Sequence, residues 1–287
     1  MPRIAYVNGR YVPHRAAAVH VEDRGYQFAD GVYEVCAVHG GRLIDERRHM
    51  ERLKRSLAEL AIRWPMRPSA LAVVLREVVR LNRIDDGIVY LQITRGVAPR
   101  DHAFPRPDVR PALVVTARAM PAEPRHRAAE KGVAVITVPD IRWARVDIKT
   151  VGLLPNVLAK EQGRAAGAYE TWFVDRDGFV TEGTSTNAWI VSAGGVLTTR
   201  PADSAILWGV TRAVLLDIVR AEGLRLEERA FSVAEAYAAQ EAFLTSATNP
   251  VTPVVKIDGR TIGKGKPGPV ALRLRRTMLD AAEMSEL

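Results

Sequence analysis

Residues 146–156 read Val146-Asp147-Ile148-Lys149-Thr150-Val151-Gly152-Leu153-Leu154-Pro155-Asn156. Lys149 has apolar neighbours in this segment, whereas most lysines and arginines of the chain stand in polar runs. Partial burial would lower the pKa of its amine and make the neutral form a nucleophile for a carbonyl carbon, as in a Schiff base. The segment alone more often describes a lysine at a strand end whose ammonium group extends into water. Other residues must decide between these interpretations.

The composition is that of a globular protein long enough for two domains, with 287 residues, 47% hydrophobic and 26% charged. No apolar run reaches the roughly 18 residues that span a bilayer, and the first residues lack the apolar core of a signal peptide. We therefore expect a cytoplasmic protein without a membrane partner. Cys36 is the only cysteine, which excludes an intrachain disulfide and a cysteine-based zinc site, and the six histidines are too scattered to predict a metal site.

The net charge of +8 raises the question of nucleic-acid binding. The arginines, however, are spread along the chain without interleaved aromatic residues, and no helix-turn-helix, zinc-finger or RNA-binding signature occurs. We expect no nucleic-acid partner. A solvated basic surface, or the binding of anionic metabolites, accounts for the charge.

Helices and strands are predicted in both halves of the chain. Asn8-Gly9 predicts a tight hairpin, Asp45 and Ser69 are candidate N-caps, and the Ser232 to Glu235 spacing is a capping box. Apolar periodicity predicts helices from 45, from 69, over 156–168, over 213–221 and from 269. Strands are predicted over 4–7, 10–12, 88–94, 112–117, 133–138, 171–174, 242–246 and 251–257.

These elements do not alternate strictly, which favours an α+β fold over a doubly wound sheet. Residues 120–125 contain two prolines in polar sequence and predict an extended crossing between domains. The predicted division is an N-terminal domain of residues 1–120 and a C-terminal domain of residues 121–287 that carries Lys149.

Few catalytic motifs occur. The glycines at 263, 265 and 268 match a dinucleotide-binding pattern, but no second strand follows to complete the βαβ unit, so a surface turn is predicted. No phosphate-binding loop, zinc-protease motif or nucleophile elbow is present. Hydrolase and nucleotide-triphosphate functions therefore lack support.

Three other segments carry small polar side chains or a helix start with free backbone N–H groups. Glu182 stands among small polar residues at 181–187, Gly209 to Thr211 open a helix whose free N–H groups attract a phosphate, and residues 245–249 offer further hydrogen-bonding side chains. Taken singly, each is equally described as a turn or a plain helix start. Together with a Schiff-base lysine they match what pyridoxal 5′-phosphate requires.

Ten segments follow one another in an order typical of one enzyme family: Glu22 to Phe28, Asp30 to Glu34, His49 with Glu51 to Leu53, Thr94 to Gly96, Pro99 to His102, Asp140 to Trp143, Asp147 to Lys149, Leu158 to Lys160, Thr181 to Gly183 with Asn187, and Gly209 to Arg212. On these segments, and over nearly its whole length, the chain resembles the fold-type IV pyridoxal-phosphate enzymes, and among them the D-amino-acid aminotransferases most.

The resemblance implies a role for each matching residue around the cofactor ring. Lys149 would hold the cofactor as a Schiff base and then move a proton between the substrate Cα and the cofactor. Glu182 would keep the pyridine nitrogen protonated, and Leu207 would pack against one face of the ring.

The resemblance also implies which residues bind the cofactor phosphate. Arg52 would bind it bidentately with the backbone amides of Val210 and Thr211, although helical spacing alone describes Arg52 as an exposed arginine. Ala247 stands where the family often has a hydroxyl residue, so there a backbone N–H, with Thr248 beside it, would serve instead.

The substrate carboxylate would be bound by Tyr33, Arg100 and His102, a guanidinium with imidazole and phenol donors. The resemblance implies that the neighbouring subunit supplies Arg100 and His102, which makes a homodimer obligatory, and that the site selects D enantiomers. By itself, an arginine in a loop is more often solvated surface.

We therefore predict transamination between a D-amino acid, such as D-alanine, and a 2-oxo acid, 2-oxoglutarate or pyruvate, by a ping-pong mechanism. The alternatives on the same fold are an (R)-selective amine transaminase, an aminodeoxychorismate lyase and a branched-chain aminotransferase. The alternative outside enzymes is a basic nucleic-acid-binding protein.

Overall fold

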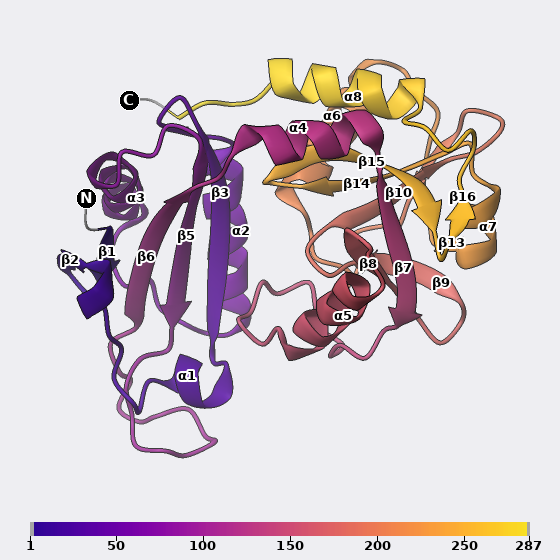
Figure 1. The fold of residues 1–287 in the computed structure, drawn as a ribbon. Helices are drawn as coiled ribbons and strands as arrows, with labels where there is room; N and C mark the ends of the chain where they lie inside the picture. The colour runs from indigo at the N-terminus through magenta and orange to yellow at the C-terminus, as the bar shows by residue number, and fades with distance from the viewer. Residues whose placement is uncertain (1–2, 286–287) are drawn as a thin grey trace. The chain divides into compact units, whose positions relative to one another are not determined.

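The computed structural model describes residues 3–285 and contains two compact units. The first unit comprises the described residues up to Pro121, the short segment Ile148–Gly152, and the described residues from Glu283 onward; the second comprises Ala122–Asp147 and Leu153–Ala282. Both contain helices and sheets, as the ribbon in Figure 1 shows, and the predicted α+β class is confirmed.

Lys149 belongs to the first unit, whereas the predicted division placed it in the second. The backbone explains the difference, because residues 149–151 return to strand β3 (Gly31–His39). The Tyr33 N–H donates to the Lys149 carbonyl at 2.9 Å and the Val151 N–H donates to the Gly31 carbonyl at 3.1 Å. The segment thus extends the sheet edge of a unit from which it is remote in sequence.

The first unit is built on a six-stranded antiparallel sheet of order β2-β1-β6-β5-β3-β4. Its first two strands form the predicted hairpin, with Asn8 and Gly9 at φ 46° and 100°. The remaining elements are β1 (Ile4–Val7), β2 (Arg10–Pro13), β4 (Arg42–Leu43), β5 (Gly87–Thr94), β6 (Ala112–Ala119), the 3-10 turn η1 (His14–Ala16), α1 (Arg24–Phe28), α2 (Glu46–Glu59) and α3 (Pro68–Leu81).

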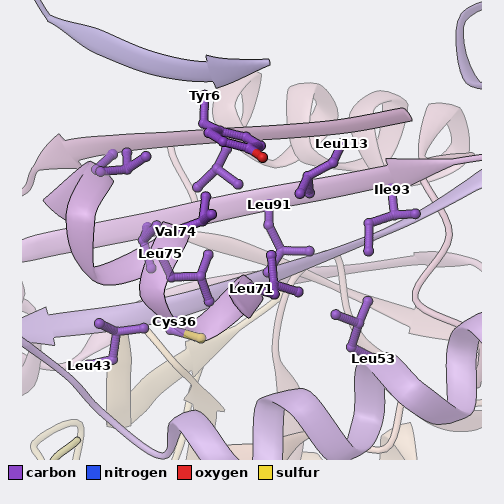
Figure 2. Close-up of a cluster of buried hydrophobic side chains, with 14 of the residues drawn as sticks. Tyr6, Cys36, Leu43, Leu53, Leu71, Val74, Leu75, Leu91, Ile93 and Leu113 are labelled. Carbon is purple, nitrogen blue, oxygen red and sulfur yellow. The ribbon is translucent and has the colours of Figure 1, made fainter. Parts of the chain in front are cut away.

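Helices α2 and α3 pack on the same face of this sheet. Figure 2 shows Leu53 of α2, and Leu71 and Leu75 of α3, among side chains from the strands. These side chains are almost fully buried, and Leu91 of β5 lies in the same cluster. Burial of apolar area at this face orients α2, and α2 carries Arg52.

The second unit contains a ten-stranded mixed sheet of order β12-β11-β10-β14-β15-β7-β8-β9-β13, with β16 paired to β15. Strand β7 is parallel to both β15 and β8. The strands are β7 (Val133–Pro139), β8 (Glu170–Val174), β9 (Phe179–Gly183), β10 (Asn187–Val191), β11 (Leu197–Thr199), β12 (Leu226–Glu228), β13 (Phe231–Ser232), β14 (Glu241–Ser246), β15 (Asn249–Ile257) and β16 (Arg260–Thr261); the helices are α4 (Ala122–Lys131), α5 (Leu154–Ala165), α6 (Val210–Ala221), α7 (Val233–Ala238) and α8 (Pro269–Asp280).

Both faces of this sheet are buried. Along β10, Ala188 and Ile190 enter one core cluster, while Trp189 and Val191 enter the other, beside α6 and α8. Every residue of β10 is buried. The strand therefore lacks the alternation of polar and apolar residues by which strands are predicted, and β10 to β13 were not predicted.

Several predicted boundaries were wrong. Helix α3 begins at Pro68 with Arg67 as its N-cap, because proline suits the first turn of a helix, so Ser69 lies inside the helix. Pro124 likewise lies in the first turn of α4, where an extended crossing had been predicted. The capping box of Ser232 and Glu235 and the turn at residues 263–268 are confirmed.

Candidate active site

The amine of Lys149 lies beside an aromatic phenol. Its Nζ donates to the Tyr33 hydroxyl at 3.2 Å and lies 4.3 Å from the centre of the Tyr33 ring. The preceding residue, Ile148, is buried in the core of the first unit, and Thr150 forms a β-bridge with Val32. The strand edge therefore fixes the backbone, while the half-buried amine stays available at the surface of the sheet. The structure brings together two of the predicted site residues.

Arg52 is buried and paired. Its Nε and Nη2 atoms donate to the two carboxylate oxygens of Glu34, each at 2.7 Å, and the His49 ring contacts the same carboxylate at 2.8 Å. Burial alone would raise the pKa of Glu34, but the charge and hydrogen bonds of Arg52 outweigh it and hold that pKa well below its ordinary value. The description of Arg52 as an exposed arginine is wrong, since 9% of its side chain is exposed.

Arg100 and His102 lie in the loop of residues 95–111, and both are exposed. The Arg100 guanidinium lies 5.1 Å from the centre of the Phe28 ring, and the His102 ring centre lies 5.4 Å from the same point. Within residues 3–285, neither makes a hydrogen bond or ring contact with Tyr33 or Lys149. Arg100 and His102 therefore share the Phe28 ring as a neighbour, whereas Tyr33, the third predicted carboxylate-binding residue, makes no such contact with them.

In the second unit, Glu182 is held by three donors at the end of β9. Arg142 Nη1 donates to its Oε1 atom, Asn187 Nδ2 donates to Oε2 at 3.0 Å, and the Leu207 N–H lies 3.1 Å from both oxygens. Its side chain is 7% exposed. The carboxylate is thus oriented by side chains and one backbone amide, while the neighbouring residues 183–186 form a turn closed by the hydrogen bond from the Gly183 N–H to the Thr186 carbonyl at 2.7 Å.

Arg142 and Asn187 carry no role in the sequence prediction. Arg142 is held in turn by Asp140, through hydrogen bonds of 2.9 and 2.7 Å to its two oxygens. Both residues lie in segments that match the family, but the match alone did not assign them. Arg142 could have been found from its position two residues after Asp140, at the end of an apolar strand. A guanidinium buried there needs a second carboxylate in addition to that of Asp140.

The N-terminus of α6 presents the amides of Val210 and Thr211. The first N–H groups of a helix have no acceptor within it, and Gly209 has no side chain to cap them. A Cβ atom at Gly209 would lie 2.1 Å from Asn187 Oδ1, so any larger residue at this helix start would displace the side chain that orients Glu182. Packing at Gly209 therefore links the start of α6 to Asn187 and, through it, to Glu182.

Ala247 and Thr248 form the turn between β14 and β15. Ser246 Oγ and Thr248 Oγ1 lie 3.3 Å apart, and Arg125 Nη1 donates to the Thr248 carbonyl at 3.2 Å. The turn therefore offers two hydroxyl groups on either side of the alanine, which suits a phosphate.

The donor set fits pyridoxal 5′-phosphate. The first unit offers a primary amine, a phenol and a guanidinium; the second offers an oriented carboxylate, helix N-terminal amides and hydroxyl groups. These are the groups that an aldehyde, a pyridine nitrogen and a phosphate require. In the part of the chain that the structure describes, no cluster of three or more acidic, histidine or cysteine side chains suits a metal ion, and no helix is long and apolar enough to cross a membrane.

Comparison with known proteins agrees with this donor set. Residues 31–257 match the family described as amino-transferase class IV. The chain is 42% identical to a D-alanine aminotransferase of Bacillus licheniformis over 279 residues, which covers 97% of this chain and 96% of the relative. The chain belongs to the class IV amino-transferase family. A D-alanine aminotransferase of Staphylococcus haemolyticus is 40% identical over 94% of both chains.

A solved aminotransferase structure shows the same fold. A T.th. branched-chain amino acid aminotransferase with pyridoxamine 5′-phosphate superimposes with a TM-score of 0.89 and is 29% identical, covering 98% of this chain and 94% of that one. The predicted fold-type IV architecture is confirmed. The cofactor prediction is confirmed for the family, whose members use pyridoxal 5′-phosphate.

Proposed function

We propose that this class IV aminotransferase catalyses transamination between a D-amino acid, such as D-alanine, and a 2-oxo acid, such as 2-oxoglutarate or pyruvate. The observation that carries the proposal is the contact between Lys149 and Tyr33, because a nucleophilic amine lies beside a phenol that suits a substrate carboxylate. The relatives named as D-alanine aminotransferases match almost the full chain at about 40% identity, which supports the D-amino-acid class.

Bound pyridoxal phosphate supplies an electron-accepting ring next to the substrate Cα. Lys149 Nζ would hold the cofactor covalently and would carry a proton at the substrate Cα, and the Tyr33 hydroxyl, which accepts a hydrogen bond from this amine, would bind the substrate carboxylate. Glu182, whose carboxylate is fixed by Arg142 and Asn187, would hold a proton on the pyridine nitrogen. Leu207 would supply an apolar contact to the ring.

Arg52 would bind the phosphate, and so would the amides of Val210 and Thr211 and the turn that contains Ala247 and Thr248. We infer that the protein is a cytoplasmic homodimer in which Arg100 and His102 of one subunit serve the partner's substrate. Their exposure and their separation from Tyr33 within one chain support that assignment.

The first experiment is a stereospecific half-reaction. The purified protein with its cofactor is mixed with D-alanine and, separately, with L-alanine, while the cofactor's absorption is recorded. Conversion of the cofactor to its amino form by the D enantiomer alone supports the proposal.

Conversion by L-alanine alone would instead favour the second candidate, a branched-chain aminotransferase, which the structural similarity to such an enzyme supports. That result would also remove the roles given to Arg100 and His102. A protein whose absorption does not respond to either enantiomer after addition of cofactor would contradict aminotransferase activity.

A further inference from the structure

Two buried arginines share one aspartate in the first unit. Asp30 Oδ2 accepts from Arg24 Nε at 2.8 Å and from Arg95 Nε at 2.7 Å, and Asp30 Oδ1 accepts from Arg95 Nη2 at 3.0 Å. No more than 9% of any of these three side chains is exposed. One carboxylate cannot neutralise two guanidinium groups, so their remaining N–H groups must find other acceptors.

Arg24 and Arg95 each donate hydrogen bonds to two backbone carbonyls, and the two pairs of carbonyls lie in different parts of the first unit. Arg95 donates to the Leu60 and Ala61 carbonyls at 2.7 and 3.1 Å, just after α2, where a helix favours positive charge. Arg24 Nη1 donates to the Asp101 carbonyl at 2.5 Å, and its Nη2 donates to the His102 carbonyl at 3.3 Å. The second pair of carbonyls lies in the loop that carries Arg100 and His102.

The same loop is tied to α1 at other points. The Arg24 N–H donates to the Gly96 carbonyl at 2.9 Å, and Asp23 forms a β-bridge with Val97. The Arg24 guanidinium lies 4.9 Å from the centre of the Phe28 ring, the ring that Arg100 and His102 also contact. One residue thus fixes the loop backbone and the aromatic surface on which both exposed side chains rest.

We propose that Arg24 is a positioning residue for substrate binding: its side chain holds the backbone of residues 101–102, so that Arg100 and His102 are presented in one fixed arrangement. The inference rests on the proposed function, in which these two side chains bind the substrate carboxylate. Contacts within its own chain, such as those of Arg24, can fix the geometry of this loop before substrate binds.

Arginine is required for this task. Asp30 fixes Nε, which sets the plane of the guanidinium and directs Nη1 and Nη2 at two successive carbonyls. A lysine would retain the charge but has a single nitrogen, so it cannot hold Asp30 and both carbonyls in this geometry. Arg24→Lys therefore tests geometry with little change in charge.

The control is Arg42→Lys. Arg42 also donates to two successive backbone carbonyls, those of Ser285 at 2.6 Å and Met284 at 3.4 Å, but far along the chain from residues 95–111. Arg100→Ala serves as the second comparison, because it removes a proposed carboxylate ligand and leaves the Arg24 contacts to residues 101–102 in place.

Three quantities are measured on each holoenzyme: the apparent dissociation constant for D-alanine, the limiting rate of the half-reaction, and backbone hydrogen exchange over residues 97–104. We expect Arg24→Lys to raise the dissociation constant by about 10-fold to 100-fold, to lower the limiting rate less, and to accelerate exchange. Arg100→Ala should raise the dissociation constant without accelerated exchange, and Arg42→Lys should change none of these quantities.

Unchanged exchange in Arg24→Lys, or accelerated exchange with unchanged D-alanine binding, would overturn the inference. If Arg100→Ala binds D-alanine with the parental dissociation constant, that result contradicts the proposed carboxylate-binding role of Arg100 and not the positioning role of Arg24. If Arg24→Lys does not fold, Phe28→Leu is tested in its place, because it removes the ring that Arg24, Arg100 and His102 contact. We expect this variant to bind D-alanine more weakly at an unchanged limiting rate. Unchanged D-alanine binding would contradict the inference.

Discussion

The guanidinium of Arg52 in α2 and the carboxylate of Glu34 in β3 form a bidentate pair with two hydrogen bonds of 2.7 Å, in which Glu34 is fully buried. The pair joins the helix to the sheet on the core side of the first unit. It also fixes the plane of the guanidinium that we assign to the cofactor phosphate. The pair therefore links the stability of the unit to the geometry of the proposed phosphate site.

Glu34→Gln should destabilise the protein by about 3–5 kcal/mol at neutral pH, because the buried Arg52 charge would lose its partner. Since the pKa of Glu34 lies below its ordinary value of 4.5, the pair contributes fully above that pH, and its contribution decreases as the pH falls further. Denaturant unfolding of both proteins from pH 7 to pH 3 measures the difference. A constant difference across this range would contradict the assignment.

Arg52→Lys should weaken the binding of pyridoxal phosphate, because a single ammonium group cannot hold Glu34 bidentately and also contact the phosphate. A loss of about 1.5–3 kcal/mol is expected for a charge-assisted hydrogen bond. Titration of the cofactor-free protein measures the affinity. Arg47→Lys on the same helix is the control, since 58% of that side chain is exposed. Equal effects of the two substitutions would contradict the phosphate role.

Lys149→Ala should give a folded protein that binds the cofactor without a covalent bond and turns over D-alanine about 10²–10⁴-fold more slowly, because the proton carrier is lost. Absorption spectra and single-turnover rates measure the two effects. Tyr33→Phe is the comparison: it removes only the hydroxyl that lies 3.2 Å from Nζ. Because the Lys149 amine is still present in this variant, its covalent bond to the cofactor should form normally. Parental turnover by Lys149→Ala would show that Lys149 is not the catalytic lysine.

Gly209→Ala should disturb both the start of α6 and the support of Glu182, because a Cβ atom there would lie 2.1 Å from Asn187 Oδ1. We expect a loss of about 1–3 kcal/mol in stability, together with weaker cofactor binding. Gly194→Ala is the control, since the nearest atom to its Cβ would be Ser192 Oγ at 3.8 Å. Thermal unfolding and cofactor titration compare the two. Wild-type values for Gly209→Ala would show that Asn187 can move without consequence.

Local structure and family were predictable from the sequence. The hairpin at Asn8-Gly9 and the capping box at Ser232 depend on a few adjacent residues whose backbone preferences are strong. The family, its fold and its cofactor were predicted from short matching segments that follow the family's order along the chain, of which the segment with Lys149 is one. Such features need no knowledge of which distant residues meet.

Only the tertiary structure decided the partners of the charged residues. Arg142 meets Glu182 across 40 positions, Arg24 meets the loop carbonyls across more than 70, and Arg52 meets Glu34 from another element. For Arg24 and Arg52, nothing in the neighbouring sequence distinguishes a buried arginine from an exposed one, because their burial results from how helices pack on sheets. A charge removed from water requires a partner, and long-range packing determines which partner it finds.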